Sequence, residues 1–238
     1  ADATESGSQS VNITISEDDS APTVSLASSS ASIAESSAST ITLTATLSII
    51  ADEAVTVTLS TSGAAVEGND YAVISDITIA AGSSTGTTTF TPIDNAVYES
   101  SKVATVAVSS VSGANATENG NQSVSITLTE YENALTVTLS TSASSIQEDA
   151  SGTITLTATL SEISDAAVTV ALATSGSSVE GTDYANVPDI TISAGSLTGT
   201  ATFNPTNDNT YEGDETAIIA IDTVSGGSAT ESGTQSQT

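Results

Sequence analysis

An internal repeat constrains the fold of this chain more than any other feature. The heptapeptide Ile-Thr-Leu-Thr-Ala-Thr-Leu stands at residues 41–47 and again 113 residues later at 154–160. Phe90 and Phe203 obey the same shift, and Ala-Thr-Glu begins at residues 3, 116 and 229. Self-similarity at a fixed period marks a repeat architecture, so we expect two copies of one fold and part of a third.

Within each copy, apolar and polar residues alternate with the period of two that is typical of half-buried β-strands. The 238 residues show no helical stripe, and Ser-Gly and Ala-Gly pairs separate the apolar runs. The pattern predicts an all-β protein made of tandem immunoglobulin-like antiparallel β-sandwiches, with about seven strands per repeat. In the first copy the expected strands lie around residues 24–26, 41–47, 55–59, 77–79, 88–90, 104–108 and 124–128.

The phase of the strands predicts the domain boundaries. We expect one sandwich over residues 21–132 and a second over 133–238, the latter lacking its last strand. Residues 1–20 then match the end of a preceding repeat, with Val11, Ile13 and Ile15 in its last strand. Two interpretations are open: residues 11–17 complete the second sandwich of a neighbouring molecule by strand addition, or the sequence is an arbitrary window on a longer array.

The charge balance excludes several classes of partner. The chain has 29 acidic residues and 1 basic residue, which gives a net charge of −28 at pH 7. Nucleic acids and anionic membranes would be repelled, and no apolar run is long enough to predict membrane insertion. This acidity either recruits divalent cations, above all Ca²⁺, or keeps an extracellular protein soluble in salt.

The acids gather in two related loops. Residues 204–215 read Asn-Pro-Thr-Asn-Asp-Asn-Thr-Tyr-Glu-Gly-Asp-Glu, and residues 91–102 read Thr-Pro-Ile-Asp-Asn-Ala-Val-Tyr-Glu-Ser-Ser-Lys. Both loops connect predicted strands, where converging carboxylates can supply the six to eight oxygens that calcium prefers. Tyr98 and Tyr211 stand just before strands, and we expect them to have a core or corner role rather than to contact a ligand.

These motifs resemble the Calx-beta domain. The resemblance rests on Val-Glu-Gly-x-Asp-Tyr at 66–71 and 179–184, on the Phe that ends a later strand, and on the acidic loop. It implies calcium bound at one tip of each sandwich and acids just after the last strand. The ligands that it implies are Glu148, Asp183, Asp208, Glu212 and Glu215 in the second copy, Glu35, Asp70, Asp94, Glu99, Glu130 and Glu132 in the first, and Glu17, Asp18 and Asp19 as the periodic equivalents after the last strand.

Lys102 is the one basic residue and takes the position that Glu215 has in the second copy. An ammonium group there would stand in for a cation, so we expect the first copy to bind fewer calcium ions or to bind them more weakly. A surface lysine without consequence is the alternative.

The sequence favours a structural role over catalysis. Without His, Arg or Cys, the serines have no evident general base and no thiol nucleophile exists, so we expect no enzyme activity. We expect a calcium-stiffened repeat of a long extracellular fibre or adhesin stalk, whose partners are adjacent repeats or copies of itself in head-to-tail order. The alternative is a calcium-responsive module that engages a protein or glycan; few aromatic residues are present to stack on sugars.

Overall fold

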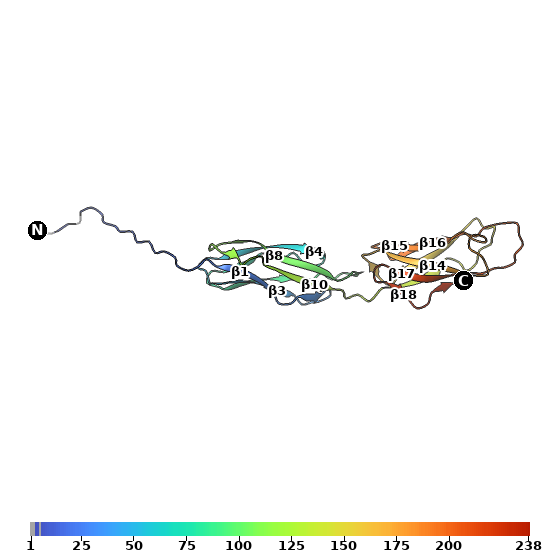
Figure 1. Cartoon of the computed structure of the whole chain (residues 1–238), viewed down its shortest axis with the longest axis horizontal. Coiled ribbons are helices and arrows are strands. Elements are labelled where there is room, and N and C mark those ends of the chain that lie inside the picture. The colour runs from blue at the N-terminus through green and yellow to red at the C-terminus, as the bar shows by residue number, and fades with distance from the viewer. Residues whose placement is uncertain (1–2, 5) are drawn as a thin grey trace.

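The computed structural model describes residues 3–4 and 6–238, and it shows two β-sandwiches joined end to end and preceded by an extended segment (Figure 1). Every regular element in the described part of the chain is a β-strand. No helix that could cross a membrane is present among those residues. The prediction of tandem all-β sandwiches is therefore confirmed.

The first sandwich consists of a four-stranded and a five-stranded sheet packed face to face. All seven runs predicted from the alternating pattern form strands, and short strands are added to them. The first sheet has the order β6 (Thr85–Phe90), β3 (Ile41–Leu47), β1 (Thr23–Ser28) and β9 (Thr117–Glu118), and the second has the order β2 (Ser32–Ala34), β10 (Ser123–Thr129), β8 (Lys102–Ser112), β4 (Val55–Gly63) and β5 (Ile77–Ile79).

Alternation along the strands creates the core. In β3, Ile41, Leu43, Ala45 and Leu47 are buried, whereas the threonines between them are half-buried on the opposite face. Burial of the isoleucine and leucine side chains, each of which contributes about 1.5–3 kcal/mol, holds the two sheets together without disulfides.

The second sandwich repeats this arrangement with two differences at one edge of its second sheet. Strand β19 (Ser236–Gln237) covers only the part of β17 that the beginning of β10 covers on β8, and residues 145–147, the counterpart of β2, form no strand. The first sheet has the order β16 (Thr198–Phe203), β12 (Ile154–Leu160), β11 (Thr136–Thr141) and β18 (Thr230–Glu231), and the second has the order β15 (Ile190–Ile192), β14 (Val168–Gly176), β17 (Ala217–Ser225) and β19.

A small two-stranded sheet bridges the two sandwiches. Strand β7 (Val97–Tyr98), from the long loop between β6 and β8, pairs in parallel with β13 (Ile163–Ser164) of the second sandwich. The Tyr98 side chain packs against the core of the second sandwich. The joint therefore includes a loop contact in addition to the linker between β10 and β11.

The described residues before β1 form no strand, and the side chains of Val11, Ile13 and Ile15 are exposed. Residues 1, 2 and 5 of the predicted N-terminal segment lie outside the described residues. The interpretation of the N-terminal segment as the end of a preceding repeat therefore stays a prediction.

The expected core role is wrong for Tyr211, whose side chain is 97% exposed. For Tyr98 it is correct only in the sense that the core it reaches belongs to the next sandwich. The tyrosines in the cores are instead Tyr71 and Tyr184 of the Val-Glu-Gly-x-Asp-Tyr motif. Their rings pack on Phe90 and Phe203, with centroid distances of 4.5 and 4.7 Å. Each of these tyrosines directly follows Val-Glu-Gly-x-Asp in both copies, and this recurrence is the sequence signal that could have identified them as core residues.

Candidate metal centre

Three loops bring the predicted acids of the second sandwich together. Ligand atoms of Glu148, Asp208 and Glu212 lie within 4.8 Å of one another, and so do those of Asp183, Glu212 and Glu215. Glu212 belongs to both groups. The five carboxylates that the sequence pattern indicated in this copy therefore form one continuous cluster, which we call the far-tip cluster.

Local backbone hydrogen bonds give these loops their shape. The Val179 N–H donates to Asp183 Oδ2 at 2.6 Å, which closes the turn of the Gly-x-Asp motif. The Asp208 N–H donates to Glu148 Oε1 at 2.7 Å, and the Thr210 N–H donates to Asp208 Oδ1 at 2.6 Å. These bonds hold one oxygen of each aspartate in a turn, which fixes where the rest of the carboxylate points.

Charge accumulates at the far-tip cluster. The pKa of Glu212 is raised by desolvation and then by the negative charges of Asp183, Asp208 and Glu148. The pKa of Glu215 is raised by desolvation and then by Asp183, Glu212 and Glu148. Like charges at this separation disfavour the ionised state unless protons or a cation neutralise them.

In the first sandwich Lys102 occupies the corresponding place. Its Nζ lies 3.1 Å from Asp70 Oδ1 and 2.7 Å from Glu99 Oε2, the counterparts of Asp183 and Glu212. Burial alone would lower the pKa of Lys102, but hydrogen bonds to Glu99 and Asp70 raise it. The ammonium group thus lies between two carboxylates of the first tip, at the position where the second copy has a third carboxylate.

The remaining acids of the first tip surround the linker. Ligand atoms of Glu35, Glu130 and Glu132 lie within 4.8 Å of one another, and we call these residues the joint cluster. The Asn95 side chain donates to Glu35 Oε1 at 2.9 Å, and the Glu99 N–H donates to Glu130. The first bond connects the loop between β6 and β8 with the segment after β2, and the second connects this loop with the linker that leads to the second sandwich.

The pKa values of the joint cluster reflect the burial and close approach of its carboxylates. Burial and the neighbouring carboxylates raise the pKa of Glu35 to about 7. A hydrogen bond with Glu130, followed by burial, raises the pKa of Glu132 to about 7. Burial opposes the ionised form of Glu130, but hydrogen bonds from Glu132, Glu99 and Tyr131 lower its pKa. Glu132 Oε2 is buried and has no hydrogen-bond partner among the described residues, so it is available to a cation.

Asp94 is the one predicted ligand of the first copy that enters neither close group. Its charge still contributes to the raised pKa of Glu35 and of Glu132, which places its carboxylate near the joint cluster.

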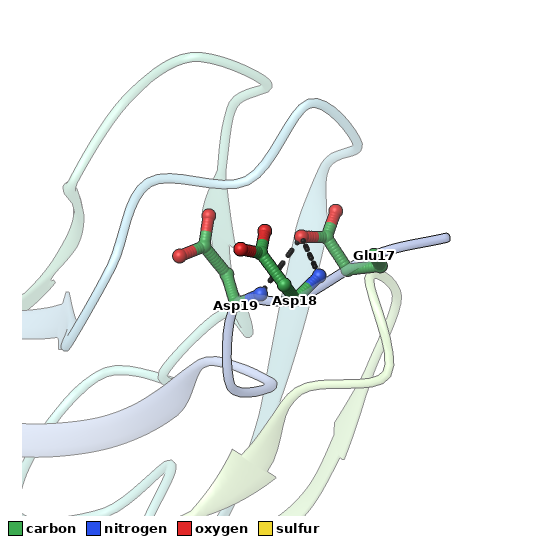
Figure 2. Close-up of side chains that lie close together, drawn as sticks. All are labelled: Glu17, Asp18 and Asp19. Atoms are coloured by element: carbon green, nitrogen blue, oxygen red, sulfur yellow. Dashed lines mark hydrogen bonds between the residues drawn. The ribbon is translucent and has the colours of Figure 1, made fainter. Parts of the chain in front are cut away.

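The three predicted acids of the N-terminal segment lie together on the extended chain (Figure 2). Glu17 Oε1 accepts hydrogen bonds from the Asp18 and Asp19 N–H groups, both at 2.9 Å. The segment lies at the opposite end of the molecule from the far-tip cluster (Figure 1). Within one chain the structure therefore does not bring these acids to the second sandwich.

Glu67 and Glu180 are two further acids with a structural role. The sequence pattern alone does not distinguish this role from metal binding. Glu67 accepts from the Ile74 N–H at 2.6 Å and from the Thr61 hydroxyl at 2.9 Å. Glu180 makes the same bonds to Val187 and Thr174. The glutamate of the Val-Glu-Gly turn thus holds the segment that follows it rather than joining the acid cluster.

Fold and loop geometry define a class of tandem all-β domains that concentrate carboxylates at one tip of each sandwich. The family model of the Calx-beta domain matches the chain twice, over residues 17–131 and 130–237, and the chain therefore belongs to the Calx-beta family. Tandem domains of this family are known as calcium-binding modules.

The chain is also similar to solved structures, at low sequence identity. The crystal structure of CBD12 from CALX1.2 has 12% identity and a TM-score of 0.40, and the match covers 84% of this chain and 80% of that chain. The D0-D1 domain of intimin has 13% identity and a TM-score of 0.26, with coverage of 84% and 90%. A comparison with curated protein sequences gives no match.

Proposed function

We propose that this chain is a calcium-stiffened structural repeat of a long extracellular fibre or adhesin stalk. The observation that carries the proposal is the presence of Lys102 in one tip at the position that Glu215 takes in the other; the tips also differ at Asn95, which stands where the second copy has Asp208. Where Lys102 neutralises Asp70 and Glu99, the second copy places Glu215 beside Asp183 and Glu212. A tip that holds an ammonium group in one copy and a third carboxylate in the other carries negative charge in the second copy that an external cation would neutralise.

The spacing of the carboxylates fits calcium. Oxygen ligands lie about 2.3–2.6 Å from Ca²⁺, so two ligands of one ion lie no more than about 5 Å apart. The separations within 4.8 Å in the far-tip cluster satisfy this limit. Glu148, Asp183, Asp208, Glu212 and Glu215 would hold the ion or ions, and Glu212, which belongs to both groups, would bridge two positions.

The joint cluster supports the mechanical part of the proposal. Glu35 belongs to the first sandwich, whereas Glu130 and Glu132 belong to the linker. A cation shared by these three carboxylates would fix the linker to the tip, next to the β7–β13 contact. Bending of one sandwich relative to the other would then require the loss of metal ligands, so the pair would behave as a rod.

Small-angle X-ray scattering of the whole chain in calcium and in EDTA tests this proposal. We expect a longer maximum dimension and a narrower spread of conformations in calcium, with isothermal titration calorimetry giving more than one bound ion per chain. Equal scattering profiles in both buffers would refute the stiffening role. A new binding surface without lengthening would instead favour the calcium-responsive module.

A further inference from the structure

Two asparagines of the first sandwich stand in a triplet that marks acceptors of N-linked sugars. Asn115-Ala-Thr117 and Asn121-Gln-Ser123 each place a hydroxyl residue two positions after the asparagine, with no proline between them. Both triplets belong to the connection between β8 and β10, which also contains β9. Because such triplets are modified on surface loops, the exposure and shape of this connection decide whether they can be acceptors.

Asn115 lies at the corner of a tight turn. The Ala116 N–H donates to the Gly113 carbonyl oxygen at 2.9 Å, and Ala114 and Asn115 between them have φ angles of 49° and 52°. Two consecutive positive φ angles closed by such a bond are typical of a type I′ turn, and asparagine adopts this left-handed backbone more readily than most residues. Asn115 is exposed, and its side-chain amide has no hydrogen-bond partner among the described residues.

Asn121 lies in a second turn, which follows β9. The Gly120 N–H donates to the Glu118 carbonyl oxygen at 3.1 Å, and Gly120 has a φ of 68°. The Gln122 N–H donates to the Glu118 carboxylate, and the Gln122 side-chain amide donates to the Asn119 carbonyl oxygen. These bonds fix the backbone on both sides of Asn121. Asn121 itself is exposed, and in the described part of the chain its side-chain amide is unpaired.

The hydroxyl residues of the two triplets are accessible as well. Thr117 and Ser123 are exposed, and neither side chain forms a hydrogen bond with another described residue. The backbone holds Thr117 in β9, since its N–H donates to the Pro22 carbonyl oxygen at 3.0 Å. The amide and the hydroxyl that the triplet requires are therefore both open to an enzyme.

Other asparagines of the chain provide a contrast. Asn119 is exposed on the same connection, but Asn121 rather than a hydroxyl residue stands two positions later. Asn204-Pro-Thr206 has the hydroxyl residue but carries proline in the middle position, which the triplet excludes. A further triplet, Asn12-Ile-Thr14, lies on the segment before β1, outside the sandwich.

The second sandwich has the turn of Asn115 without the acceptor. Ser228 takes this place with a φ of 53°, and the Ala229 N–H donates to the Gly226 carbonyl oxygen at 3.1 Å. Thr230 keeps the hydroxyl residue two positions later, and both Ser228 and Thr230 are exposed. The two copies therefore have the same turn and differ in the residue that would carry a sugar.

We propose that Asn115 and Asn121 are acceptor sites for N-linked glycosylation. The side-chain nitrogen of each asparagine attacks the anomeric carbon of a sugar that is joined to a diphosphate. The bond between this carbon and the diphosphate oxygen breaks, the diphosphate leaves with the bonding electrons, and the nitrogen loses one proton to a base of the glycosyltransferase. The sugars cover the end of the first sandwich that lies away from Lys102, at the other end of β8. This modification goes beyond the proposed calcium-dependent role and does not rest on it.

Transfer of glucose to the whole folded chain tests the proposal. The chain is incubated with UDP-glucose and a soluble N-glycosyltransferase that modifies Asn-x-Ser/Thr triplets, and peptide mapping by mass spectrometry locates each added hexose. We expect one hexose on Asn115 and one on Asn121, and none on Asn119 or Asn204. A synthetic peptide of residues 112–124 is the positive control for the enzyme.

Single substitutions separate the two acceptors. Thr117→Ala should abolish the hexose on Asn115 and leave that on Asn121, and Ser123→Ala should have the reverse effect. Thr117→Ser keeps a hydroxyl and should retain the modification of Asn115. Because these side chains are exposed and unbonded, the melting temperature should not change. Ser228→Asn places the acceptor on the equivalent turn and should create a site in the second sandwich.

The proposal is overturned for either asparagine if the control peptide gains a hexose there and the folded chain does not. It is also overturned if Thr117→Ala leaves the hexose on Asn115, because the modification would then be independent of the triplet. A hexose on Asn119 in the folded chain would contradict it for the same reason.

Discussion

Replacing Lys102 by methionine tests the built-in cation most directly. Methionine keeps an unbranched side chain at the beginning of β8 but removes the ammonium group that bridges Asp70 and Glu99. These two carboxylates would then face each other, with Glu35 and Glu130 lining the same small cavity. The side chains of Lys102, Asp70 and Glu99 are 22%, 7% and 15% exposed, so water screens their charges only partly.

The expected loss follows from these contacts. Each hydrogen bond to a charged group contributes about 1.5–3 kcal/mol, and partial exposure reduces the total of the two. We therefore expect Lys102→Met to lower the free energy of unfolding of the first sandwich by about 2–4 kcal/mol in EDTA. For a domain of this size, that corresponds to a fall in melting temperature of roughly 10–20 °C.

Calcium should restore much of this loss, because an ion that binds the folded state at 100 times its dissociation constant adds about 2.7 kcal/mol. Differential scanning calorimetry in EDTA and in calcium provides the measurement, and the transition of the second sandwich serves as an internal reference. Lys102→Arg, which keeps the charge, is the matched control. A loss below about 0.5 kcal/mol in EDTA, or no recovery in calcium, would refute the view that Lys102 replaces a metal ion.

Other changes test the remaining parts of the site. Lys102→Glu places a carboxylate at the position of Glu215, while Asn95 still stands where the second copy has Asp208, so calorimetric titration should find one additional calcium ion per chain; an unchanged stoichiometry would contradict the view that Lys102 replaces a metal ion. Glu212→Gln removes the carboxylate shared by both groups of the far-tip cluster and should weaken calcium binding by at least about 10-fold, whereas Asp214→Asn, on the same loop but outside the close groups, should change affinity by less than about 3-fold. For pH, the folded state holds a proton on Glu35 up to about pH 7 and the unfolded state only up to about 4.5, so in EDTA the first sandwich should be most stable below pH 4.5 with respect to this group and lose up to about 3 kcal/mol as the pH rises through 7. Glu35→Gln should flatten that dependence in urea titrations, and a stability that increases between pH 5 and 7 through Glu35 would show the opposite linkage. Glutamate-specific protease should cut the loop around Glu212 and Glu215 faster in EDTA than in calcium, as followed by mass spectrometry, and equal rates would mean that calcium does not order this loop.

The strands, the two sandwiches and the acidic loops of this protein could be predicted from its sequence. Alternation at period two and recurrence at 113 residues predicted the strands, the two sandwiches and the loops that carry the acids, because both signals are local or simply periodic. The predicted ligands of the second copy also converge as expected, since a repeated turn motif fixes Asp183 and a long loop carries Glu212 and Glu215.

Other features depended on contacts between distant parts of the chain. The bond from Lys102 to Asp70, the docking of Tyr98 on the next sandwich and the burial of Tyr71 on Phe90 each join residues that no period connects. Tyr98 and Tyr211 occupy equivalent positions in sequence, yet one is packed and the other is exposed. A sequence pattern assigns equivalent residues equivalent environments, whereas packing is decided by which surface stands opposite, and only the tertiary structure supplies that surface.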